Sequence, residues 1–330
     1  MLRTSARSLV LHVLGLVLAA ASLAAAAHAE TPSDCPTWFP DFRCDRHGRP
    51  DGFIAPGTDP YVFEDPFITT GLSAWYLWHA FPDSSPLTGG AVNVAAVQAR
   101  IAITDRLGFI ATRDGWAWTN PDLSILDNDN GPMDVGLGFK YLLVSMPEHN
   151  FYLSPSLRFD IPAGDRSVFQ GNGDGTIMPA IHAAWGVYER LHFLANAGVQ
   201  IPFDNDSQVA MAFWNFQMDL QVAPWFVPFA GINGYTYLGD GDGNFKIKTD
   251  LGTLTLSQAT AALGSRPVNG VDYGNLGSDS VYGQTTATLA AGLRIPIGKH
   301  FSVSAAYEAP VTNYPDVFKQ RVTTNLLVEF

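Results

Sequence analysis

Charged residues are scarce in this chain of 330 residues, and positive charge is the scarcer sign. Asp, Glu, Lys and Arg make up 15% of the sequence, whereas soluble globular proteins average about 25%. The 19 Lys and Arg stand against 31 Asp and Glu, which gives a formal net charge of −12. Such a chain is unsuited to binding nucleic acid through a basic surface, so we expect no nucleic-acid partner.

Long apolar runs are missing beyond residue 29. Before it, Arg3 and Arg7 precede the stretch LVLHVLGLVLAAASLAAAA, and Ala27 and Ala29 supply the small residues of a cleavage site. This pattern predicts a secretory signal peptide over residues 1–29, with an uncleaved transmembrane helix as the alternative. If the rest of the chain meets a membrane, it must do so through strands.

Cysteine is nearly absent, since Cys35 and Cys44 are the two in the sequence. In an oxidising compartment they predict one disulfide. A metal site that includes His47 is the alternative, but it would need further ligands. Both cysteines lie in residues 30–66, which are rich in Pro, Gly and Asp and lack strand periodicity. We expect this segment to be a periplasmic leader or a plug inside a barrel, and we favour the leader.

Alternation of apolar and polar residues fills the chain from about Phe67 onward. In FYLSPSLRFDI, which covers 151–161, the odd positions are apolar and most even positions are polar. A period of two indicates β-strands. The strand at 225–238 is apolar on both faces, so its orientation is not predicted. The twelve predicted strands are 67–79, 91–103, 107–116, 132–144, 151–161, 176–187, 191–203, 208–222, 225–238, 281–296, 300–309 and 319–330.

The connections between these strands alternate in length. The short ones are TDR, SMPEHN, YER, AP and IGK, and the long ones include TNPDLSILDNDNGP, PAGDRSVFQGNGDG and the stretch from Gly239 to Ser280. Outer-membrane barrels have short periplasmic turns, long outer loops and an even number of strands. The sequence therefore predicts an all-β fold, an antiparallel transmembrane β-barrel of the bacterial outer membrane over residues 67–330.

The last stretch, RVTTNLLVEF, predicts a strand that closes this barrel. Val322, Leu326, Val328 and Phe330 share one face, while Arg321 and Asn325 lie on the other. We expect the apolar face to meet lipid, with the terminal aromatic ring at the membrane interface. Such an ending also resembles the signal read by the barrel assembly machinery, so we assign Phe330 to an assembly signal.

Polar residues on the inward faces are the candidates for function. A lumen with charges of both signs guides a solute or closes itself through ion pairs. If it closes itself, we expect Arg158 to pair with Asp134 or Asp160, and Glu308 to pair with Arg321 across the last outer loop. The predicted solute path comprises Arg100, Lys140, Arg158, Asp160, Asp219 and Arg294.

His182 is the one candidate for hydrolytic chemistry, with Ser154 and Ser156 on the preceding strand. No nucleophile motif surrounds either serine, so we favour a hydrogen-bonded interior histidine. The stretch DGDGN begins at Asp240 like a calcium loop, but Leu251 stands where an EF-hand needs Glu. We therefore expect neither an enzyme, nor a cofactor, nor a metal site.

Five stretches resemble a family of bacterial outer-membrane proteins assigned to the meta-cleavage pathway of phenol degradation. They are FEDPFITTGLSAWYLW, ITDRLGFIATRDG, DVGLGFKYLLV, SLRFDIPAG and YERLHFLANAGVQIP, and the resemblance spans about Phe63 to Phe330. It implies the barrel fold and the passage of small aromatic or hydrophobic compounds. It carries no catalytic or binding residues to this chain.

We predict an outer-membrane channel or transporter for small hydrophobic or aromatic solutes, which contacts outer-membrane lipid and lipopolysaccharide. Two alternatives stay open. A closed barrel would bind a partner or surface through the long loop from Gly239 to Ser280, and an outer-membrane lipid hydrolase would depend on His182.

Overall fold

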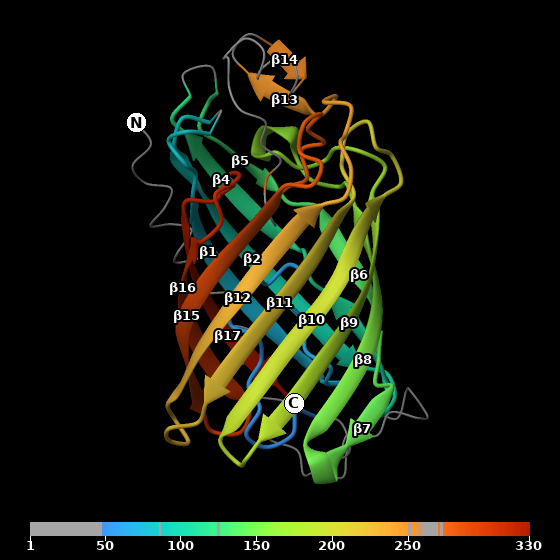
Figure 1. The fold of residues 1–330 in the computed structure, drawn as a ribbon, viewed down its shortest axis with the longest axis vertical. Helices are drawn as coiled ribbons and strands as arrows, with labels where there is room; N and C mark the ends of the chain where they lie inside the picture. Colours follow the sequence, from blue (N-terminus) through green and yellow to red (C-terminus); the bar gives the residue numbers. More distant parts are fainter. Residues whose placement is uncertain are drawn as a thin grey trace. The chain divides into compact units, whose positions relative to one another are not determined.

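A computed structural model describes residues 48–85, 87–123, 126–249, 252–255, 258, 270 and 273–330. The predicted signal peptide and the Cys35–Cys44 disulfide lie outside the described residues. The described residues form an antiparallel β-barrel (Figure 1). No helix in this part of the chain is long and apolar enough to cross a membrane.

Twelve strands close the barrel. Its sheet has 15 strand segments, of which β4, β5 and β7 only prolong others, leaving twelve (15 − 3). Because β1 pairs with both β2 and β17, the sheet has no open edge, and the predicted barrel is confirmed. The twelve are β1 (Gly71–Ala80), β2 (Gly90–Ala102), β3 (Leu107–Ala111), β6 (Val135–Tyr141), β8 (Phe151–Ile161), β9 (Thr176–Val187), β10 (Leu191–Pro202), β11 (Met211–Leu220), β12 (Val227–Tyr237), β15 (Thr285–Ile297), β16 (Phe301–Pro310) and β17 (Gln320–Glu329).

Two barrel strands are interrupted. β4 (Gly115–Pro121) continues β3, and the two pair with different halves of β2. Between them, the consecutive residues Thr112 and Arg113 are both buried, which is the signature of a β-bulge. The predicted strand at 107–116 ends too early, because the bulge shifts the alternation by one residue. β5 (Asp129–Pro132) and β7 (Val144–Met146) likewise extend β6 at its two ends.

One end of the barrel carries short turns and the other carries long loops. We call them the turn end and the loop end. Two short 3₁₀ helices, η1 (Pro147–His149) and η2 (Arg166–Val168), lie in these connections. The longest connection joins β12 to β15 and contains the hairpin of β13 (Lys246–Thr249) and β14 (Gly252–Thr255), which lies beyond the strands at the loop end (Figure 1).

The outer surface of the wall is a belt of exposed apolar side chains. In water, such an apolar surface would cause the protein to associate with other molecules. A barrel wall that contacts lipid, by contrast, needs an apolar outer surface. As predicted, Arg321, Thr323 and Asn325 of the last strand are buried and Phe330 is 47% exposed, but Val328, which we expected to meet lipid, is only 7% exposed. The belt includes Leu72, Val97, Phe139, Leu157, Ile181, Trp185, Phe216, Leu289, Val303 and Tyr307.

Strand β12, whose orientation was not predicted, turns its polar and larger aromatic residues inward. Val227, Phe229, Asn233, Tyr235 and Tyr237 are all buried. The tyrosines face inward because polar groups are available there: Tyr235 donates to Asp59, and Tyr237 donates to Asp316.

Residues 53–69, which precede β1, lie inside the barrel. Most of residues 53–69, which we call the plug, are buried. They include residues 53–66 of the segment that we predicted to be a leader or a plug. Plug residues Phe53, Phe63 and Phe67 pack against Tyr152 and Leu194 of the wall, so apolar contacts seat the plug as well as polar ones.

Candidate functional site

Inward side chains hold the plug through its backbone carbonyl groups. The donors come from β2, β6, β8, β9, β10 and β15, so the plug is hydrogen-bonded to strands on several sides of the barrel. Contacts of this kind recognise the main chain whatever the plug side chains are. The pairs are Arg294 with Pro56 (3.1 Å), Gln98 with Pro60 (2.6 Å), Arg158 with Tyr61, Asn196 with Val62 (2.6 Å), His182 with Glu64 (2.9 Å), Lys140 with Asp65 (2.7 Å) and Ser154 with Pro66 (2.6 Å).

A buried carboxylate anchors the plug to two wall cations. Arg100 donates from Nε to Glu64 Oε1 (2.8 Å) and from Nη2 to Oε2 (2.7 Å). Lys140 Nζ donates to the same Oε1 at 2.8 Å. Burial alone would raise the pKa of Glu64, but Arg100 and Lys140 outweigh it and hold that pKa well below its ordinary value. Glu64 is therefore a carboxylate at neutral pH.

Asp65, the next plug residue, is connected through Arg49 to the last strand of the barrel. Its carboxylate lies 2.8 Å from Arg49 Nη1, and Arg49 Nη2 lies 2.9 Å from Oε1 of Glu329 in β17. The backbone N–H of Phe330 also donates to the Thr70 carbonyl at 2.9 Å. The seam between the first and last strands and the base of the plug thus share a set of contacts.

Tyr61 joins the plug to the loops. Its hydroxyl donates to Asp160, and Arg113 lies 2.9 Å from the same carboxylate. The Arg113 guanidinium sits 4.4 Å from the Tyr61 ring centroid, within the range of a cation–π contact. Arg113 also donates to the Tyr273 carbonyl of the longest loop at 3.1 Å.

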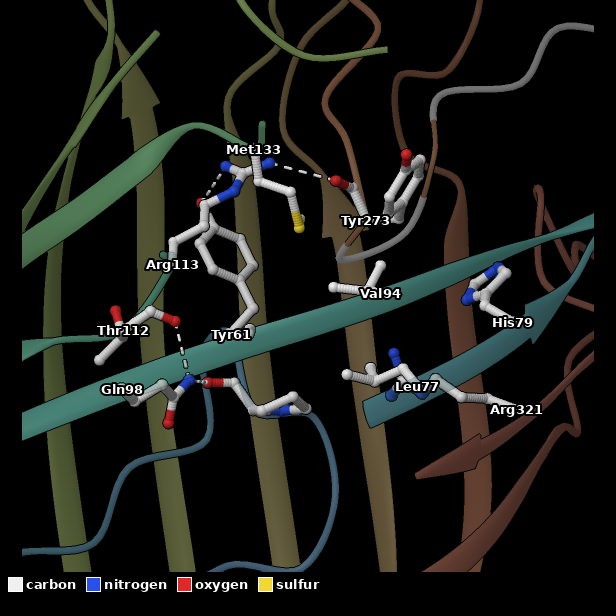
Figure 2. Close-up of a pocket in the computed structure, with 12 residues that line it drawn as sticks. Tyr61, Leu77, His79, Val94, Gln98, Thr112, Arg113, Met133, Tyr273 and Arg321 are labelled. Carbon is white, nitrogen blue, oxygen red and sulfur yellow. Dashed lines mark hydrogen bonds between the residues drawn. The ribbon is translucent and has the colours of Figure 1, made fainter. Parts of the chain in front are cut away.

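A small cavity lies between the plug and the loops (Figure 2). Its volume is about 50 Å³, well below the roughly 150 Å³ of a protein cavity known to bind benzene. Figure 2 shows Arg113 against the Tyr61 ring, with Leu77 and Val94 on the neighbouring strands. This cavity therefore has room for water but not for an aromatic ring.

A larger cavity of about 450 Å³ lies at the turn end. Phe53 at the start of the plug lines it, together with Asn150, Tyr188 and His192. The plug thus contributes to both cavities, Phe53 to this one and Tyr61 to the smaller one.

All six residues of the predicted solute path are buried in the barrel interior: Arg100, Lys140, Arg158, Asp160, Asp219 and Arg294. They do not form one group, since Asp219 pairs with His192 at 2.9 Å, beside the turn-end cavity. Their role in solute passage stays a prediction.

Of the two predicted ion pairs, one is present. Arg321 Nη2 lies 2.6 Å from Glu308 Oε2, as predicted. Within the described residues Arg158 has no carboxylate partner, so its pairing with Asp134 or Asp160 is wrong. The bulge turns Arg113 inward, where it takes Asp160, and Asp134 instead accepts the N–H groups of residues 164 and 171.

Comparison with known protein families identifies the family to which this chain belongs. The family described as "Putative MetA-pathway of phenol degradation" matches residues 84–252, which is 169 of the 330 residues (252 − 83). The chain belongs to this family. The resemblance of the five sequence stretches to the phenol-degradation family is therefore confirmed. None of the curated proteins compared matches the sequence.

Solved structures are also similar to this family member. The COG4313 outer membrane channel from Pseudomonas putida F1 has a TM-score of 0.55 and 14% identity, covering 84% of this chain and 100% of that one. The NanC porin has a TM-score of 0.47 and 10% identity, covering 78% and 98%. At such identities the first match shows a shared fold.

Sequence reasoning missed the plug side of the site and one wall residue in this family member. Arg113 was missed because strict alternation from Ile110 places it on the outer face. The available signal was the charged pair Arg113 and Asp114, which follows the apolar run LGFIA within the predicted strand. Glu64 and Tyr61 were missed because they lie in a segment without strand periodicity.

His182 and Ser156 of this phenol-degradation family member do meet, since Nε2 and Oγ lie 2.7 Å apart. The other ring nitrogen of His182 binds the Glu64 carbonyl, so the described residues place no carboxylate behind the histidine as a triad would. His182 thereby contacts the plug. Among the described residues, no group of three or more His, Cys, Asp or Glu could hold a metal ion.

Proposed function

We propose that this protein is an outer-membrane channel for small hydrophobic or aromatic solutes, which the plug holds closed. The long loops then face the outside and the short turns face the periplasm. The apolar belt and the family membership support the location. The COG4313 channel, which has the same fold, supports a channel over a purely structural barrel.

The observation that carries the proposal is what fills the lumen. Barrels of eight strands are filled by their own side chains, whereas those of sixteen or more leave an open channel. In this twelve-strand barrel the interior is filled by a separate segment, residues 53–69. The plug forms no strand in the wall, so its withdrawal leaves the strand pairing intact.

Passage requires the plug to move. The cavity above it must grow from about 50 Å³ to roughly 150 Å³ before a benzene-sized ring fits. Arg158 is the residue to change first, because it is 1% exposed and donates to the Tyr61 carbonyl next to that cavity. Its replacement by Ala both releases a plug carbonyl and enlarges the lumen.

The test is single-channel conductance of the refolded full-length protein in planar bilayers. We expect small discrete conductance steps from the natural protein and larger ones from Arg158→Ala. Arg106→Ala is the matched control, because Arg106 is exposed in the turn between β2 and β3. Phenol added to the bath should interrupt the ion current, whereas glycerol should not. If the natural protein and both variants fold into barrels but none of them conducts ions, the channel function is refuted.

A further inference from the structure

Among the residues that the structure describes, four buried cations of the wall lack a carboxylate partner on the wall itself. Among the described residues, Arg100 and Lys140 pair only with Glu64 and Asp65 of the plug. Arg158 and Arg294 bind only neutral oxygens. All four are at most 9% exposed. A desolvated cation without a counter-charge is unfavourable, so the wall without its plug requires anions.

Arg100 and Lys140 together provide a complete binding site for one carboxylate. The Nε and Nη2 atoms of Arg100 each bind a different oxygen of Glu64, and Lys140 adds a third bond. This fork geometry is the preferred way in which a guanidinium binds a carboxylate. The Glu64 side chain thus occupies a site that would accept any carboxylate of suitable size.

Two of these four cations also have hydrogen-bond donors that the plug does not use. Among the described residues, Nε and Nη2 of Arg158 have no hydrogen-bond partner, and neither has Nε of Arg294. Buried donors are ordinarily satisfied. Both side chains lie on the inner wall beside the plug, so unused donors remain along the lumen even when the plug is in place.

The surroundings of Glu64 indicate what the rest of the ligand looks like. Phe63, the preceding residue, packs in a cluster with Tyr152, Ala184 and Leu194 of the wall. The plug thus carries an aromatic residue and a carboxylate residue at consecutive positions, each contacting the inner wall. If the plug withdraws, those three wall residues are uncovered as an apolar surface in the same lumen as Arg100 and Lys140.

We propose that Arg100 and Lys140 form a carboxylate-binding site of this channel, that Glu64 occupies it in the closed state, and that small aromatic carboxylates are solutes which displace Glu64. As a statement about solutes this rests on the proposed channel function, but binding itself does not require conduction. Because Glu64 is tethered, it competes at an effective concentration of about millimolar or more.

The test is calorimetric titration of the detergent-solubilised full chain with benzoate, with benzamide as the uncharged probe of the same shape. We expect Glu64→Gln to bind benzoate at least about tenfold more tightly than the natural protein, because the internal competitor is gone. Adding Arg100→Gln to that variant should abolish benzoate binding. Glu148→Gln, which changes an exposed glutamate, is the matched control and should behave as the natural protein does.

Equal binding of benzoate and benzamide to Glu64→Gln, or benzoate binding that survives Arg100→Gln, would overturn the proposal. If Glu64→Gln does not fold, hydrogen exchange of the natural protein decides: benzoate should speed exchange of the plug amides and benzamide should not, and equal exchange rates refute displacement. Benzoate binding by a barrel that is silent in bilayers would refute the channel and leave the site standing. Conductance without benzoate binding would refute the carboxylate-binding site and leave the channel standing.

Discussion

Replacing Lys140 by Met should loosen the plug while the barrel wall stays intact. Lys140 Nζ contacts Glu64 Oε1 at 2.8 Å, the Asp65 carbonyl at 2.7 Å and Asp65 Oδ1 at 3.4 Å, and Met fills similar space without these bonds. Removing one partner of a buried ion pair costs about 3–5 kcal/mol. Arg100 still holds Glu64, so we expect the lower value, about 3 kcal/mol, which raises the plug-withdrawn population about a hundredfold.

Native-state hydrogen exchange measures this directly. The backbone N–H groups of Gly57, Phe63 and Phe67 are hydrogen-bonded within the plugged lumen, and they should exchange about a hundredfold faster in Lys140→Met. The amides of β9 and β10 should exchange at the natural rate. Lys248→Met is the matched control, since Lys248 pairs with Asp129 while 66% exposed, and solvent screening leaves such exposed pairs with little effect on stability. Plug amides that keep their natural rate, or strand amides that accelerate equally, would refute the reasoning.

Three further predictions follow from single residues. A Cβ added at Gly57 would lie 2.1 Å from Cζ of Phe229, whereas one at Gly48 would meet no atom within 4 Å; Gly57→Ala should therefore displace the plug and raise bilayer conductance, and Gly48→Ala should not. Deleting Phe330, which binds the Thr70 carbonyl at 2.9 Å, should reduce the heat-modifiable barrel in the outer membrane, and unchanged levels would argue against an assembly signal. Cys35 and Cys44 should resist alkylation in exported protein until it is reduced, so labelling before reduction would exclude the disulfide.

The barrel could be predicted from the sequence because its signal is local. Residues 151–161 and 176–187 become β8 and β9 over the predicted ranges, since an inward position and an outward position alternate in the sequence as they do in the wall. The bulge at Thr112 and Arg113 could not be predicted, because one inserted residue leaves both flanking patterns regular and only changes their phase.

Apart from Arg113, the wall half of the candidate site could be predicted for the same reason, whereas the plug half could not. Arg100, Lys140 and Arg158 follow from alternation alone. Glu64 and Tyr61 receive their partners from residues far along the chain, such as His182, which is 118 positions from Glu64. A segment held through its carbonyl groups needs no particular side-chain period, so composition could not decide between a leader and a plug for residues 53–66.

The contacts between Arg49, Asp65 and Glu329 have a consequence for biogenesis. Arg49 reaches both the base of the plug and the last strand, and that strand is in place only after it pairs with β1. The plug therefore cannot be fully seated on a half-built sheet. Pairing of β17 with β1 and docking of the plug therefore occur as one cooperative event. A nascent barrel stalled before its last strand would keep its plug undocked, and its lumen would be accessible to quality-control proteases.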